Sequence, residues 1–123
     1  MNHEREMVAM AEGYLELGEF QEAWDFTETI PCIQGICSGI VRVRIICAIA
    51  LRHFEIAEEL VCFLGTGPFP FRKFAGGILH ELAGAYCHAG DTEHARKLIS
   101  DAIRIWPDER FSIIENPALE SLF

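Results

Sequence analysis

The sequence lacks clusters of basic residues. Its 10 Lys and Arg are scattered among 19 Asp and Glu, which gives a formal net charge of −9 at pH 7. Proteins that bind DNA or RNA neutralise phosphates with basic patches, so this charge argues against a nucleic-acid partner. The acidity fits a basic protein partner, although keeping the domain soluble is a sufficient explanation.

Long apolar segments are also missing. The longest apolar run, Ile45 to Leu51, is much shorter than the roughly 20 residues that a membrane-spanning helix needs. The N-terminal residues Met1 to Glu6 do not lead from basic charge into an apolar stretch, as a signal peptide does. We therefore expect a cytoplasmic protein that does not associate with membranes.

Closely spaced cysteine pairs are absent. The odd number of cysteines, without an export signal, favours reduced thiols. Cys32 and Cys37 with Cys87 and His88 form a candidate zinc site, but the usual Cys-x-x-Cys spacing is missing, so we expect no metal. The cysteines Cys47, Cys62 and Cys87 are expected to be small core residues.

No motif of an enzyme is complete. The segment Gly65-Thr66-Gly67 is followed by Pro-Phe-Pro, where a phosphate loop would have Lys and Ser or Thr. His80-Glu81 begins like a zinc-protease motif, but Gly84 stands where the second His is needed, so His80 is expected to be an ordinary helix-surface residue. We therefore predict a protein that is not an enzyme and has no cofactor.

The composition is that of a folded domain. Half of the 123 residues are hydrophobic. A chain of this length buries somewhat over ~60% of the surface that its unfolded form exposes. The sequence therefore predicts a single domain spanning residues 1–123.

Three segments of the chain share a pattern of a helix end, a tight turn and a new helix with an early alanine. The spacing from Ala23 to Ala57 is 34 residues, and from Ala57 to Ala95 it is 38. Gly18 and Gly90 stand where a helix needs a left-handed terminator, and Asp91 can cap the next helix. An internal period in this range indicates a helical repeat.

The flanks of these turns have helical periodicity. Before the third turn, Leu79, Leu82, Ala83 and Tyr86 fall on one face, and no segment alternates with period two for long. The sequence thus predicts an all-α fold of six main helices in three antiparallel pairs. Asn116 reads as the N-cap of a short C-terminal helix whose Leu119, Leu122 and Phe123 cover the open end of the third pair.

The pattern resembles the tetratricopeptide repeat. The third unit fits best, with its residues at the family spacing: Leu79, Leu82-Ala83, Tyr86, Ala95, Ile99 and Pro107. The second unit fits least, because Arg44 stands where Leu is expected. The resemblance implies repeats over about 4–37, 38–70 and 71–107, stacked as a right-handed superhelix, with a cap over 108–123.

The resemblance also implies a peptide or helix bound along the concave face that the first helix of each pair lines. The lining positions would be Val8, Glu12, Leu15, Arg42, Ile46, Ile49, His80, Gly84 and Cys87. The basic clamp that some family members use for a carboxylate is missing, because the matching positions hold Val8, Glu12, Val43, Gly77 and Glu81. Ile46 and Ile49 would form an apolar floor beside Arg42, and a homodimer covering the same patch is the alternative.

Three functions are compatible with these features of the sequence. The first is a non-catalytic adaptor or scaffold that binds a protein or peptide. The second is a cytoplasmic secretion-type chaperone, a role that small acidic members of the family serve. An unrecognised enzyme ranks last, because no acid, base and nucleophile converge in the sequence.

Overall fold

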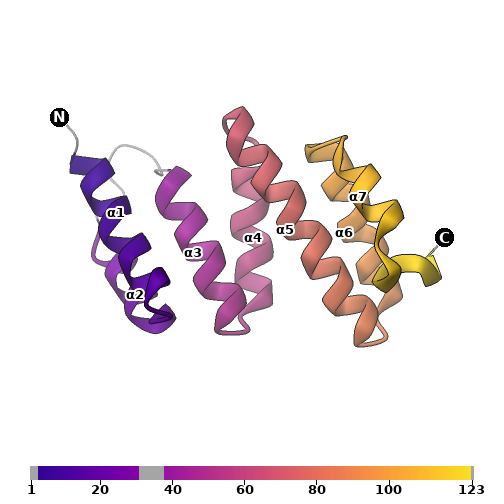
Figure 1. Ribbon diagram of the computed structural model, residues 1–123, viewed down its shortest axis with the longest axis horizontal. Coiled ribbons are helices and arrows are strands. Elements are labelled where there is room, and N and C mark those ends of the chain that lie inside the picture. Colours follow the sequence, from indigo (N-terminus) through magenta and orange to yellow (C-terminus); the bar gives the residue numbers. More distant parts are fainter. Residues whose placement is uncertain (1–2, 31–37, 123) are drawn as a thin grey trace. The chain divides into compact units, whose positions relative to one another are not determined.

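A computed structural model of the chain describes residues 3–30 and 38–122. These residues are almost entirely helical and contain no strand (Figure 1), which confirms the all-α prediction. The helices are α1 His3–Glu16, α2 Phe20–Glu28, α3 Ser38–Ala50, α4 Phe54–Leu64, α5 Phe69–His88, α6 Thr92–Ile105, α7 Glu109–Glu115 and the 3-10 helix η1 Pro117–Leu122. The chain divides into two compact units, Met1–Leu60 and Val61–Phe123, and the boundary between them lies within α4.

The turns between α1 and α2, α3 and α4, and α5 and α6 have one hydrogen-bond pattern. In the first, the Gly18 amide donates to the Leu15 carbonyl at 2.9 Å and the Glu19 amide donates to the Tyr14 carbonyl at 3.0 Å. This pair of bonds defines the Schellman motif, which satisfies carbonyls at a helix end. In the second turn, the Arg52 amide donates to the Ile49 carbonyl (3.0 Å) and the His53 amide to the Ala48 carbonyl (2.7 Å). In the third turn, the Gly90 amide donates to the Cys87 carbonyl (3.1 Å) and the Asp91 amide to the Tyr86 carbonyl (2.9 Å).

The central residue of each turn has a left-handed backbone. Its φ is 73° at Gly18, 64° at Arg52 and 92° at Gly90. Glycine adopts this conformation freely, whereas a residue with a Cβ atom does so at a cost of roughly 1–2 kcal/mol. The middle turn therefore keeps the common geometry with a less suitable residue.

Each turn is followed, five residues after its left-handed residue, by a fully buried alanine. Ala23, Ala57 and Ala95 all have no exposed surface, as the sequence predicts. A side chain this small lets the two helices of a hairpin approach closely. In the third hairpin, the Asp91 side chain accepts a hydrogen bond from the His94 amide at 3.1 Å, which confirms the predicted cap.

The N-terminal unit has its core between α1, α2 and α3. The buried residues of this cluster are Ala11, Ala23, Ile40, Val43 and Cys47. The guanidinium of Arg44 in α3 lies over the Trp24 ring, 4.3 Å from the ring centre. A cation over an aromatic face is a favourable contact, which accounts for Arg where the repeat pattern has Leu.

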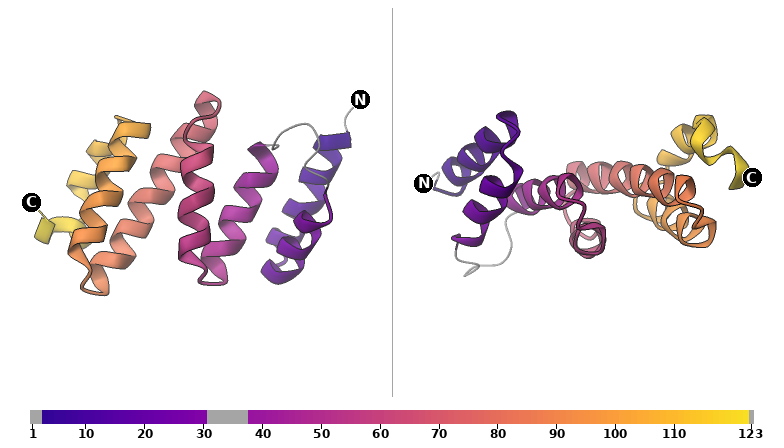
Figure 2. Two further views of the ribbon diagram at one scale, coloured as in Figure 1. Left: turned by 180° about the vertical axis from the view of Figure 1, so that it is seen from behind. Right: turned by 90° about the horizontal axis from the view of Figure 1, so that it is seen from below.

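The C-terminal unit is built on the antiparallel pair α5 and α6 (Figure 2). The two helices are so close at Gly76 that a Cβ atom there would lie 2.7 Å from the Trp106 Cβ. Leu79, Leu82 and Leu98 fill the rest of this contact and are buried. The close approach therefore depends on glycine at position 76.

The end of the chain is more elaborate than the single short helix expected there. Both α7 and η1 pack against α5, and α7 also contacts α6. Ile113 of α7 and Leu119 of η1 are buried, so the expected burial of Leu119 is confirmed. Asn116 caps η1 as predicted, since its Oδ1 accepts a hydrogen bond from the Ala118 amide at 2.9 Å. Phe123 lies outside the described residues.

Candidate functional site

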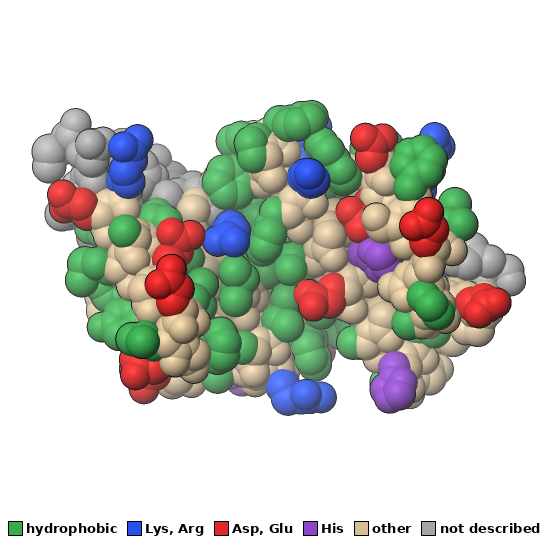
Figure 3. Space-filling view, in the orientation of Figure 1, with side chains coloured by type: hydrophobic (Ala, Val, Ile, Leu, Met, Phe, Trp, Pro, Cys, Tyr) green, Lys and Arg blue, Asp and Glu red, His purple; other side chains and the backbone are tan. Residues whose placement is uncertain are grey.

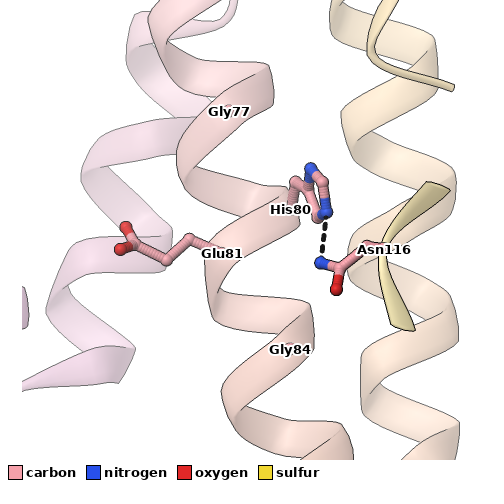
Figure 4. Close-up of a pocket in the computed structure, with 5 residues that line it drawn as sticks. All are labelled: Gly77, His80, Glu81, Gly84 and Asn116. Carbon is pink, nitrogen blue, oxygen red and sulfur yellow. Dashed lines mark hydrogen bonds between the residues drawn. The ribbon is translucent and has the colours of Figure 1, made fainter. Parts of the chain in front are cut away.

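A hollow of about 350 Å³ lies on one face of α5, beside the junction between α7 and η1 (Figure 4). It is lined by Gly77, His80, Glu81, Gly84 and Asn116, and we call it the glycine hollow. The first four residues share one face because they recur at helical spacing. Asn116 reaches the same place from the junction between α7 and η1.

Two glycines that packing does not require line the glycine hollow. A Cβ atom built on Gly77 or on Gly84 meets no other atom within 4 Å, in contrast to Gly76. Glycine inside a helix costs roughly 0.5–1 kcal/mol relative to alanine. The chain thus carries two destabilising residues on a face that they leave open to an incoming group.

His80 forms one wall of the glycine hollow and is bonded at both ring nitrogens. Its Nδ1 lies 2.8 Å from the Glu109 Oε2, and its Nε2 lies 2.8 Å from the Asn116 Nδ2 (Figure 4 draws the second bond). The side chains of His80 and Glu109 are only 14% and 15% exposed, so water competes weakly for these bonds. His80 is therefore a connecting residue between α5, α7 and η1, and the expectation of an ordinary surface histidine is wrong.

The bonds of Asn116 determine where the His80 proton lies. The Asn116 Oδ1 accepts from the Ala118 amide, which turns the Nδ2 group of the same amide toward His80. An amide nitrogen only donates, so the His80 Nε2 must be the acceptor. The His80 proton therefore resides on Nδ1 and is donated to Glu109.

Glu81 forms the other side of the glycine hollow. Figure 4 shows its carboxylate directed away from the His80–Asn116 pair. It is exposed and has no ion pair or hydrogen bond within residues 3–30 and 38–122. Glu115 and Glu120, on either side of Asn116, are also exposed, and Figure 3 shows acidic side chains over α5 and α7. The surroundings of the hollow are therefore acidic.

Of the predicted lining positions in the N-terminal unit, two pair with each other and the others are half-buried. Val8 and Leu15 are half-buried against the α1–α3 core. The Arg42 guanidinium bonds the Glu12 carboxylate at 3.2 Å, so two expected ligand-binding groups pair within the chain. Ile46 and Ile49 are half-buried.

The structure brings His80 and Gly84 together in the glycine hollow, but Cys87 lies beyond it. Cys87 is half-buried, and its Sγ lies 3.6 Å from the Ser121 Oγ of η1. The sequence indicated Gly77 only as a position where a basic clamp is missing, and Glu81 as such a position and as part of the incomplete zinc-protease motif. Asn116 carried no sequence signal for this site, because it is 36 residues from His80.

The cysteines differ in their surroundings. Cys47 is buried, and this burial raises the pKa of its thiol to about 11. Cys62 is exposed, so the expectation that it lies in the core is wrong. Cys32 and Cys37 lie outside the described residues, within which no group of three or more His, Cys, Asp or Glu is arranged to hold a metal.

Comparison with models of protein families, with curated proteins and with solved structures finds no match to this chain. Over the described part of the chain, no helix combines the length and the apolar character needed to cross a bilayer. What the site does must therefore be inferred from the geometry of its own residues.

Proposed function

We propose that this chain is a tetratricopeptide-like, non-catalytic interaction domain that acts as an adaptor and binds a peptide or helix of another protein at the glycine hollow. The observation that carries the proposal is the common geometry of the three turns. Each has the same two hydrogen bonds, the same left-handed residue and a buried alanine five residues later. Repeated helical hairpins commonly serve as binding scaffolds, because stacked units form extended surfaces.

The glycine hollow has properties that suit a protein ligand. Its two glycines have no Cβ atoms, so the backbone of a partner can come close to α5 there, as small residues allow wherever helices approach each other. The carboxylate of Glu81 has no partner within the described chain. A basic side chain in the ligand would pair with it and complement the acidic surroundings.

We also propose a cytoplasmic location. Five cysteines in 123 residues cannot all form disulfides within one chain. Reduced thiols are characteristic of cytosolic proteins.

Selection from a displayed library of random peptides tests the binding proposal. The protein is immobilised, and the affinities of the selected peptides are compared for the wild type, Gly84→Leu and Glu81→Lys. Gly84→Leu fills the glycine hollow without meeting other atoms at its Cβ. Ser100→Leu and Glu93→Lys are the matched controls, because both residues are exposed on α6.

We expect the two hollow variants to weaken binding by about tenfold, which corresponds to about 1.4 kcal/mol, and the α6 controls to change it little. NMR shifts caused by a selected peptide should be largest at Gly77 and Gly84. Peptides that bind Gly84→Leu as tightly as the wild type, or that shift residues elsewhere, would show that the hollow is not the binding site.

A further inference from the structure

Three groups around the glycine hollow form a continuous chain of hydrogen bonds. The Glu109 carboxylate accepts from His80, His80 accepts from the Asn116 amide, and the Asn116 oxygen accepts from the Ala118 backbone amide. The distances are 2.8, 2.8 and 2.9 Å. Every donor has an acceptor only while His80 is neutral.

A second proton on His80 creates a conflict in this chain. Protonated imidazole donates at both nitrogens, so its Nε2–H would point at the Nδ2 group of Asn116, which is also a donor. Rotating the Asn116 amide offers Oδ1 to His80 but removes the acceptor of the Ala118 amide. Either the bond to His80 or the cap of η1 must then be lost.

Protonation of His80 should not weaken the contact between α5 and α7, because of the charges around the ring. The charged group in contact with the ring is Glu109 of α7, and a positive imidazolium strengthens that bond. On α5 the nearest carboxylate in sequence, that of Glu81, is directed away from the His80–Asn116 pair, and Glu120 of η1 is exposed. On α6, Asp101 is engaged by Lys97 and Arg104. The conflict is thus confined to Asn116 and the start of η1.

We propose that His80 is a proton-sensitive lock on the glycine hollow, which releases the Asn116 wall and the cap of η1 when the imidazole takes up its second proton. Histidine is the side chain that changes charge between about pH 5 and pH 8. Because Asn116 lines the hollow, the lock regulates the binding surface, and this consequence rests on the function proposed above. The lock itself is a property of the chain without any partner.

NMR of the full-length ¹⁵N-labelled chain without a ligand tests the lock. The His80 ring nitrogens report protonation, and the exchange of the Ala118 amide with water reports the cap, corrected for the intrinsic pH dependence of exchange. Two variants accompany the wild type. Asn116→Asp keeps a good cap and gives protonated His80 an acceptor, and His80→Gln cannot titrate in this range.

We expect the corrected exchange of the Ala118 amide to rise roughly fivefold in the wild type as His80 is protonated, as the loss of one cap predicts. Asn116→Asp should abolish that rise, and His80→Gln should show no pH dependence. The lock is excluded by any of three results: His80 staying neutral down to about pH 5, protonation of the ring without a change at Ala118, or the same pH dependence in His80→Gln. Since no peptide is present, these results do not depend on whether the hollow binds a partner.

Discussion

The first helices of the three hairpins have equivalent positions. Their side chains pair with each other in the N-terminal unit, whereas in the C-terminal unit they leave part of the surface open. Ten residues before the left-handed turn residue stand Val8, Arg42 and His80, and six residues before it stand Glu12, Ile46 and Gly84. In the N-terminal unit, Arg42 and Glu12 bond each other across α1 and α3. In the C-terminal unit, the same positions hold a histidine tied to the chain end and a glycine that leaves the surface open.

The difference shows that the turn sets the register of a hairpin while side-chain size decides whether its outer face is open. The three turns place equivalent residues alike, because the same hydrogen bonds end each first helix. Long side chains at these positions reach a neighbouring helix and pair, as Glu12 and Arg42 do. Glycine has no side chain that could reach a neighbour, so Gly84 at its equivalent position leaves the surface open, as Gly77 does elsewhere on the same face of α5.

The largest difference between the two units is expected in the rates at which their thiols react with a labelling reagent. Burial raises the pKa of the Cys47 thiol from 9.0 to about 11, which lowers its thiolate fraction roughly 100-fold near neutral pH. Exposed Cys62 serves as the internal control. Timed labelling of native protein, mapped by mass spectrometry, should therefore show Cys47 reacting at least about 100-fold more slowly than Cys62.

The rate at Cys47 should rise with pH toward 11, since deprotonation of the buried thiol limits the reaction. Equal rates at Cys47 and Cys62 in native protein would show that the α1–α3 core is open to reagent. Labelling in denaturant should remove the difference.

The buried alanines should respond alike in both units. Ala23→Leu and Ala95→Leu each force a large side chain between two helices, which should lower the free energy of unfolding by about 1–3 kcal/mol. Ala85→Leu is the control on the exposed side of α5 and should change stability by less than about 0.5 kcal/mol. Urea unfolding measures all three, and a neutral Ala95→Leu would mean that α5 and α6 pair differently.

Neighbouring glycines of α5 should have opposite effects when replaced by alanine. Gly76→Ala places a Cβ against Trp106 and should destabilise the chain by about 1–2 kcal/mol, because both backbones are held by packing. Gly77→Ala enters open space and should stabilise it by about 0.5–1 kcal/mol. Thermal unfolding should show melting temperatures on opposite sides of the wild type, and a loss of stability in Gly77→Ala would contradict an open hollow.

The ion pair between Arg42 and Glu12 should have the smallest effect on the free energy of unfolding. The Arg42 and Glu12 side chains are 38% and 45% exposed, and such pairs typically contribute about 0.2–1 kcal/mol. A double-mutant cycle with Arg42→Ala and Glu12→Ala isolates the coupling between the two side chains from the other effects of each substitution. The coupling should decrease with added salt, and a coupling well above ~1 kcal/mol would mean that the pair is shielded from water.

The sequence by itself determined helices α1 to α6, the turns within the three hairpins and the small residues between paired helices. These follow from short-range rules: Gly18 and Gly90 end helices, Asp91 caps one, and Ala23, Ala57 and Ala95 recur at the depth where two helices meet. The middle turn was found from its spacing alone, since Arg52 is not a residue that a left-handed turn selects. Local hydrogen bonds and helical periodicity need no knowledge of distant residues.

Only the tertiary structure decided the identity of the site. The pairing of Glu12 with Arg42 and of His80 with Asn116 joins residues 30 and 36 positions apart, and no local rule indicates such contacts. The structure also shows that the adjacent residues Gly76 and Gly77 have different roles. Packing requires glycine at position 76, whereas Gly77 faces open space. Helical rotation of about 100° per residue turns the two glycines to different faces, and what each face meets depends on how the other helices fold onto α5.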